Sequence, residues 1–334
     1  MSLRESDHGA DRRGRLDRVV IATPFPWFGG KSRISSDVWR RFGPVQNYVE
    51  PFFGSGAVLL GRPRGASGIE TVNDKDGFVA NFWRAVSAEP EAVAVYADWP
   101  VNENDQHARH SWLVSQRETL TSRLEGDPEF FDAKIAGWWV WGINCWIGSG
   151  WCSGDGPWRV DEGQLVHLGD AGRGLIEWME ALARRLRYVR VCCGDWTRVC
   201  GPTPTTKQGL TAVFLDPPYS DGERQSDIYS IDDSSISSAV ATWALEHGDD
   251  PMFRIALCGY DTEHVVTRSG WTTLRWKARG GYGSQGQGRG RDNSDRETVW
   301  FSPHCLRPQD SLFAQLEDDD GVDAAKTRRE CEVT

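Results

Sequence analysis

The octapeptide Ala212-Val-Phe-Leu-Asp-Pro-Pro-Tyr219 carries residue types suited to chemistry, because an apolar run ends on a carboxylate, two prolines and an aromatic ring. Residues 213–215 are predicted to form a buried strand, since a short apolar run without polar alternation suits a sheet covered on both faces. The prolines have no backbone N–H and must end the strand. Asp216 and Tyr219 should then lie at the carboxyl edge of the sheet, where open α/β folds bind ligands. Such a turn could hold a planar group that bears an amine; the alternative is an ordinary turn capped by the aspartate.

A second dense segment is Pro24-Phe-Pro-Trp-Phe-Gly-Gly-Lys-Ser32. It ends like a phosphate-binding loop, but Phe25 stands where that motif requires glycine, which disfavours a nucleoside triphosphate site. What remains is an aromatic pair, two glycines that let the backbone approach a neighbour closely, and a lysine before a helix expected over residues 35–42. The alternative is a proline-rich turn with a solvated lysine.

Strand, glycine turn and helix follow each other next, as in Rossmann-like folds. Residues 45–50 are predicted to be a strand that runs into Pro51-Phe-Phe-Gly-Ser-Gly-Ala57 and a helix through residue 60. A second strand over residues 69–73 leads to Asp74, at about the distance where such folds place a ribose-binding acid. Asp74 is the predicted hydroxyl acceptor; the alternative is a turn former, since Asn-Asp-Lys-Asp-Gly also favours turns.

Length and composition limit the class of protein. A chain of 334 residues with 17 Trp can form one large folded domain or two modest ones. Its net charge of −10 argues against indiscriminate nucleic-acid binding, although one groove can differ from the whole. No stretch approaches a membrane span or a signal peptide, so a cytoplasmic protein is expected. The eight Cys form no C-x-x-C pair, so no metal site is expected, and Cys192, Cys193 and Cys200 are interpreted as small core residues.

The pattern predicts an interrupted α/β domain. The expected parts are a flexible arm over residues 1–18, an α/β domain over 19–87 and 187–303, an insertion over 88–186 and an acidic disordered tail over 304–334. Within the insertion, helices are expected over residues 103–124 and 129–146, followed by a segment rich in Trp and Gly. Most of these rings should be core, but Trp146 and Trp151 are candidates for stacking on bases.

The second half of the α/β domain alternates predicted helices and strands. Helices are expected over residues 175–187, 234–247 and 261–269, and strands over 188–193 and 253–258. Residues 271–277 and 297–301 should form an antiparallel pair. Its connection is glycine-rich and basic, and through Arg279, Arg289 and Arg291 it could follow a phosphate backbone. A disordered surface loop is the alternative for the connection.

Four motifs in this order resemble those of the Dam-type DNA adenine methyltransferases. They are Pro26-Trp-Phe-Gly-Gly-Lys31, Tyr48-Val-Glu-Pro-Phe-Phe-Gly-Ser-Gly56, Asn73-Asp74 and Asp216-Pro-Pro-Tyr219. The resemblance implies an α/β, Rossmann-like methyltransferase sheet with helices on both faces and an inserted, mainly helical target-recognition domain. It further implies S-adenosylmethionine as methyl donor, double-stranded DNA as partner, base flipping, a bacterial or phage origin, and a cognate restriction or defence protein as a further class of partner.

The resemblance also implies roles for the residues that match the family's motifs. Trp27 and Lys31 would close over the methionine end of the cofactor, and Asp74 would bind the ribose hydroxyls. The cofactor turn would comprise Glu50, Phe52, Gly54 and Gly56. Asp195 and Trp196 would lie near the cofactor's adenine. Asp216 would border the cofactor and, with Pro217 and Tyr219, would be catalytic.

The implied chemistry suits these residues. An aromatic amine is a poor nucleophile because its lone pair is delocalised, and Asp216 with the Pro217 carbonyl could accept both amine hydrogens and make the nitrogen more nucleophilic. Stacking on Tyr219, worth roughly 1–3 kcal/mol, could offset part of the cost of flipping the base. Tyr229 is a second candidate for the opposite face of the base.

Two other functions stay open at this stage. The same methyl transfer could act on another acceptor, such as the cytosine amine, RNA or a protein amide. The chain could also be a non-catalytic nucleic-acid-binding protein that keeps the scaffold. A pure binder has no need of Asp216, Tyr219, Lys31 and Asp74 together, which speaks against this second alternative. The target sequence cannot be transferred, since the insertion carries only a loose echo of the family's pattern.

Overall fold

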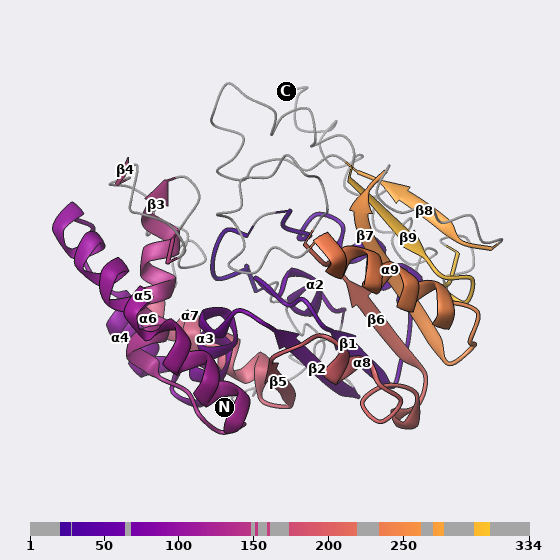
Figure 1. Cartoon of the computed structure of the whole chain (residues 1–334), viewed down its shortest axis with the longest axis horizontal. Helices are drawn as coiled ribbons and strands as arrows, with labels where there is room; N and C mark the ends of the chain where they lie inside the picture. The colour runs from indigo at the N-terminus through magenta and orange to yellow at the C-terminus, as the bar shows by residue number, and fades with distance from the viewer. Residues whose placement is uncertain are drawn as a thin grey trace, which may run out of the picture.

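A mixed β-sheet with helices on both faces forms the centre of the protein (Figure 1). The computed structural model describes residues 21–27, 29–63, 68–147, 151–152, 159–160, 174–218, 234–261, 270–276 and 297–307. The strands of the sheet within these ranges are β1 Asn47–Glu50, β2 Ile69–Asp74, β5 Val189–Cys193, β6 Thr211–Leu215, β7 Phe253–Tyr260, β8 Thr272–Arg275 and β9 Glu297–Phe301. The α/β class expected from the sequence is confirmed.

The order of the strands is β5-β2-β1-β6-β7-β9-β8. The first five are parallel, whereas β9 runs antiparallel to both β7 and β8, as expected for residues 271–277 and 297–301. The chain moves outward from β1 through β2 to β5 and then returns to place β6 on the other side of β1. This reversal is the topological switch point, where open α/β sheets bind ligands at the carboxyl ends of the strands.

Strand β6 shows why both faces of the sheet are covered. All five of its residues are buried, and they alternate between two hydrophobic clusters, with Ala212 and Phe214 in one and Val213 and Leu215 in the other. The first cluster also holds side chains of three helices, α1 Ser35–Phe42, α2 Ala57–Leu60 and α3 Gly77–Ala88. The second holds side chains of α8 Thr197–Cys200 and α9 Ser234–His247. A strand buried on both faces needs the unbroken apolar run that the sequence shows.

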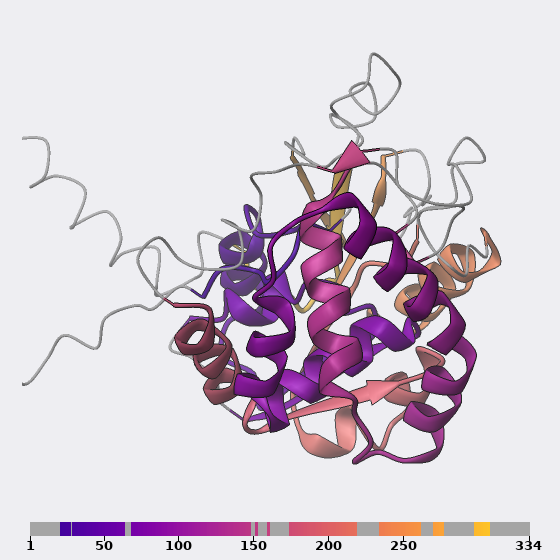
Figure 2. The ribbon, with the colours of Figure 1, turned by 90° about the vertical axis from the view of Figure 1, so that its left-hand side faces the viewer.

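A group of helices lies at the β5 end of the sheet, opposite β8 (Figures 1 and 2). It consists of α4 Pro90–Ala97, α5 Glu103–Gly126, α6 Ala133–Cys145 and α7 Leu175–Leu186, with the short antiparallel pair of β3 Trp146–Ile147 and β4 Arg159–Val160. Helices α5, α6 and α7 pack against α3, and their apolar side chains belong to the same cluster as the first face of the sheet. The predicted insertion over residues 88–186 therefore shares a core with the α/β part.

One helix starts later than predicted and another was not predicted, and both differences have local reasons. Helix α6 begins at Ala133 rather than at residue 129, because the side chain of Asp132 caps it by accepting a hydrogen bond from the Ile135 N–H at 2.8 Å. Helix α4 was not predicted at all. Pro90 occupies its first turn, where the missing N–H of proline has no partner to lose.

Other predictions lie partly outside the described ranges. The predicted arm over residues 1–18 and residues 262–269 of the predicted helix lie outside the described residues. Of the predicted tail, residues 304–307 are described, and the Leu306 N–H donates to the Arg41 carbonyl at 2.8 Å. No helix in the described ranges combines the length and the apolar character that crossing a membrane requires.

A buried ionic cluster joins α2, β2 and α7. Glu70 on β2 is 1% exposed, and it pairs with Arg62 at 2.7 Å and with Arg185 through two contacts of 2.7 and 2.9 Å. Arg62 and Arg185 also donate to the carbonyls of Val45 and Leu59. Two guanidinium groups share one carboxylate, and the backbone carbonyls accept further hydrogen bonds, so no ion of the cluster is buried without a partner.

Removal of one member of this cluster should unfold the protein more readily. Arg185→Ala is expected to lower the free energy of unfolding by about 3 kcal/mol, because it withdraws the bidentate partner of a buried carboxylate. Arg184→Ala is the matched control, since Arg184 is the exposed neighbour on the same helix and should change the stability by less than about 0.5 kcal/mol. Urea titration of both variants measures the difference. Equal losses would show that the buried cluster does not stabilise the fold.

Candidate functional site

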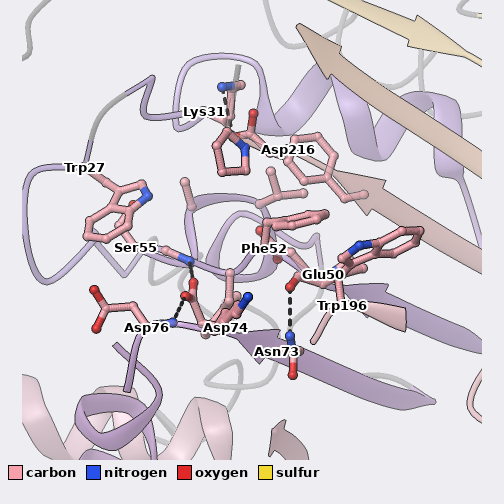
Figure 3. Close-up of a pocket in the computed structure, with 18 of the residues that line it drawn as sticks. Trp27, Lys31, Glu50, Phe52, Ser55, Asn73, Asp74, Asp76, Trp196 and Asp216 are labelled. Atoms are coloured by element: carbon pink, nitrogen blue, oxygen red, sulfur yellow. Dashed lines mark hydrogen bonds and ion pairs between the residues drawn. The ribbon is translucent and has the colours of Figure 1, made fainter. Parts of the chain in front are cut away.

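A pocket lies at the carboxyl edge of the sheet, at the switch point between β1 and β6 (Figure 3). Its empty volume is about 990 Å³, including space that opens to solvent. The turns after β1, β2, β5 and β6 all contribute to its wall, together with Trp27, Gly30 and Lys31. The sequence-predicted residues among those that line it are Trp27, Lys31, Glu50, Phe52, Gly54, Asp74, Asp195, Trp196 and Asp216. The pocket therefore brings together residues that lie far apart along the chain.

Lys31 connects the early segment to the end of β6. Its ammonium lies 2.9 Å from Asp216 Oδ2 and donates to the Gly29 carbonyl at 2.7 Å. A second carboxylate, Glu297 Oε2 at the start of β9, lies 3.7 Å away. Lys31 is only 4% exposed. Burial alone would lower the pKa of Lys31, but the carboxylates of Asp216 and Glu297 outweigh it and raise the pKa, so the lysine stays charged.

The segment that carries Lys31 is anchored by an aromatic side chain. Phe25 is 2% exposed and contacts the rings of Phe82, Trp83 and Trp139 on α3 and α6. The carbonyl of Pro24 accepts a hydrogen bond from Asn144 Nδ2 at 3.1 Å. This anchoring leaves Trp27, the next aromatic residue, at the wall of the pocket (Figure 3).

The glycine turn after β1 makes room for Trp27. Gly54 has φ +48°, and a Cβ placed there would lie 2.3 Å from the indole nitrogen of Trp27. Gly56 has φ +70° at the start of α2, and a Cβ there would lie 2.9 Å from the ring of Phe53. Both positions require glycine for conformation and for space. The resemblance implies that both glycines belong to a cofactor turn, whereas the close approaches found at Gly54 and Gly56 are made by side chains of the protein.

Glu50 ends β1 at the wall of the pocket. It is 3% exposed and accepts a hydrogen bond from the Tyr48 hydroxyl at 2.7 Å. Burial raises the pKa of Glu50 well above its usual range, and the nearby Asp216 carboxylate raises it further. The raised pKa favours the protonated form, which would let Glu50 donate a hydrogen bond as well as accept one.

Asp74 ends β2 and is held by the turn after β1. Its Oδ2 accepts from the Gly54 N–H at 2.9 Å, and its Oδ1 accepts from the Asp76 N–H at 2.9 Å. Burial raises the pKa of Asp74 to about 7, although the backbone donors oppose the shift. These two hydrogen bonds fix the carboxylate in the pocket, with acceptor capacity left for a ligand hydroxyl.

The turn after β5 completes this side of the pocket. Asn73 Nδ2 donates to the carbonyls of Pro51 and Gly194 at 3.1 and 2.9 Å, so one buried amide ties the turns after β1 and β5 together. Asp195 is exposed, and its carboxylate accepts from the backbone and the hydroxyl of Thr197, which lower its pKa. The ring of Trp196 lies 6.3 Å from that of Phe52 at an interplanar angle of 31°.

The two tryptophans predicted to contact bases have other partners here. Trp146 is 2% exposed, and its ring is stacked on His110 at 5.1 Å. Trp151 donates from Nε1 to the Trp139 carbonyl at 3.0 Å. This arrangement gives no support to base stacking by either ring, and their contact with DNA stays a prediction.

The remaining predicted site residues divide into two groups. Pro217 is buried directly after Asp216, as the predicted end of the strand requires. Those outside the described residues are Tyr219, Tyr229, Arg279, Arg289 and Arg291.

Glu297, Tyr48 and Asn73 belong to the site but were not among the predicted site residues. Glu297 opens the run Glu-Thr-Val-Trp-Phe, in which every residue is buried. Glu50 likewise lies at one end of a strand in which every residue is buried, but it was predicted through its place in the cofactor turn. Glu297 was not predicted because ligand sites are expected at the carboxyl ends of parallel strands, whereas Glu297 lies at the amino end of β9, which runs antiparallel to β7.

The pKa of Asp74 predicts a pH-dependent stability. An unfolded aspartate ionises near pH 4 and the folded one near pH 7, so between these values the folded state holds a proton that the unfolded state has lost. The stability contributed by this group is therefore complete below about pH 4 and is lost as the pH rises towards 7. Asp74→Asn should remove this part of the slope when thermal unfolding is followed from pH 4 to 8. An unchanged slope would contradict the raised pKa.

The comparisons with known proteins do not assign a family. No protein-family model matches the chain, and no curated protein matches it. The function of the site must therefore be inferred from its own geometry and charge.

Proposed function

We propose that the protein transfers the methyl group of S-adenosylmethionine to the exocyclic amine of adenine in DNA. The observation that carries the proposal is the ion pair of 2.9 Å between Lys31 and Asp216 at the edge of the pocket. It unites the lysine of the first motif with the acid of the last, as the resemblance to Dam-type methyltransferases requires. On this proposal the sheet is a methyltransferase sheet, and the helical group α4–α7 is the target-recognition part.

The charge of the pocket supports a cofactor without phosphates. Four aspartates line it, namely Asp74, Asp76, Asp195 and Asp216. Of its two lysines, Lys31 is engaged by Asp216, and Lys75 is exposed beside the pocket. A dinucleotide would bring a pyrophosphate into this acidic surrounding, which repels anions. A sulfonium nucleoside instead brings a positive charge, hydroxyls and an adenine, which suit carboxylates and flat rings.

The residues present fit S-adenosylmethionine at each of its parts. Asp74 can accept from the ribose hydroxyls, while its hydrogen bonds to the Gly54 and Asp76 N–H groups keep it in place. Phe52 and Trp196 offer aromatic surface on the side of the pocket opposite Trp27 (Figure 3). Trp27 and the carboxylates near Lys31 would surround the methionine part. When bound, the cofactor would supply an electrophilic methyl group.

The chain's own contribution to the reaction would be alignment and hydrogen bonding. Asp216 can accept a hydrogen bond from the amine and draw its lone pair out of conjugation. Lys31 fixes the carboxylate through Oδ2, so that Asp216 does not have to reorient during the reaction. As the nitrogen bonds to the methyl carbon, the bond from that carbon to sulfur would break and S-adenosylhomocysteine would be released. The nitrogen would then carry one proton too many, which must leave to a base or to water. Alignment of the amine with the methyl donor can lower the barrier by up to roughly 7–11 kcal/mol.

The substrate is tested by incubating the protein with labelled S-adenosylmethionine and unmethylated double-stranded DNA. Nucleoside mass spectrometry should then find N6-methyladenine. Label in cytosine, or label accepted only from RNA or protein, would move the proposal to another acceptor amine. Failure of the protein to bind S-adenosylmethionine in isothermal titration would refute the proposal.

Substitutions of two aspartates in the pocket should change the kinetics in different ways. Asp216→Asn is expected to lower kcat about 10²–10³-fold with little change in cofactor affinity, since it weakens an acceptor needed in the transition state. Asp74→Asn is the matched variant, and it should raise the KM for the cofactor with a smaller effect on kcat. Steady-state kinetics at saturating DNA separate the two. A normal kcat in the Asp216 variant would remove it from the catalytic step.

A further inference from the structure

We propose that Glu297 is a positioning residue of the site, which keeps Asp216 an effective hydrogen-bond acceptor by sharing the charge of Lys31. This inference rests on the proposed methyl transfer. Its basis is the pair of carboxylates around one buried ammonium, with Asp216 Oδ2 at 2.9 Å and Glu297 Oε2 at 3.7 Å. Glu297 and Lys31 are each 4% exposed as side chains, so bulk water screens their interaction little.

The reversed strand is what brings Glu297 to the pocket edge. Because β9 runs antiparallel to β7, its first residue lies opposite the last residue of β7, in the pair Tyr260–Glu297. The backbone N–H of Trp276, just after β8, donates to the Glu297 carbonyl at 3.1 Å. The ring of Trp276 lies 5.7 Å from the Lys31 ammonium, within reach of a cation–π interaction. Residues of β9 and of the turn after β8 thus lie close to Lys31.

The charge balance of the cluster explains why a second acid is useful. Lys31 and Asp216 alone would form a neutral pair, in which the ammonium draws electron density from the carboxylate that has to accept from the amine. With Glu297 the three groups carry one net negative charge. This charge complements the positive charge of a sulfonium donor and of the nitrogen as it is methylated.

A purely structural role makes different predictions. If Glu297 only neutralised a buried lysine, its replacement would lower stability and leave kcat of the folded protein unchanged. A positioning role predicts a loss in kcat with little change in KM, and recovery when the charge is restored. The two roles therefore separate in kinetics.

The kinetic test compares three variants on β9 in the methyl-transfer assay. Glu297→Gln keeps the size of the side chain and removes its charge, and it should lower kcat at least 10-fold with KM for cofactor and DNA within about 3-fold. Glu297→Asp keeps the charge and should recover most of the lost kcat. Thr298→Val is the control, since it is the next residue on the strand and faces the opposite side, and it should stay within about 2-fold of the original kcat.

A binding experiment measures the effect of the Glu297 charge on ligand affinity without catalysis. Isothermal titration with S-adenosylmethionine and with S-adenosylhomocysteine, which lacks the sulfonium charge, should show Glu297→Gln weakening the first ligand about 2–3-fold more than the second. An equal change for both ligands, or a Glu297→Gln kcat within about 2-fold of the original, would overturn this inference alone. A protein that binds neither ligand would overturn the proposed function and this inference with it.

Discussion

The buried charge of Lys31 is the constraint on which the arrangement of the site depends. Removing an ammonium from water costs several kcal/mol, so the chain has to supply partners before the lysine can be 4% exposed. The carboxylates of Asp216 and Glu297 and the carbonyl of Gly29 supply them. These groups come from three segments that are distant in sequence. Their convergence is therefore a requirement of folding as well as a condition for chemistry.

The topology of the sheet meets this requirement. Parallel strands bring their carboxyl ends to one edge, which places Glu50, Asp74 and Asp216 around a common space. A parallel strand would deliver its amino end to the far edge, so a residue that opens a strand can join the site only if that strand is reversed. β9 is reversed, and its first residue is Glu297. The antiparallel strand is thus a means of adding a further side chain to the pocket from another direction.

Much of the fold could be predicted from local patterns. The apolar run of β6 predicts a buried strand, because a strand covered on both faces has no polar alternation. The strands β1, β2 and β9 were also predicted, although each of them carries polar residues. The site followed where a strand ended on a polar residue, as at Asp74 and Asp216. Glu297 escaped because its role depends on the direction of a strand, which no local pattern reveals. Trp146 shows the same limit, since its ring type suits stacking on bases but its neighbours in space bury it.

The glycine turn shows why a motif has to be interpreted through its contacts. Spacing alone gives the same prediction for any strand–glycine–helix unit, namely a backbone surface open to a ligand. Here the side of Gly54 on which other residues carry a Cβ lies against the indole of Trp27, and the Gly54 N–H donates a hydrogen bond to Asp74. The turn therefore sets the positions of an aromatic wall and of a carboxylate. An enlarged residue at Gly54 would displace both at once, so this glycine governs the pocket by placing side chains that surround a ligand.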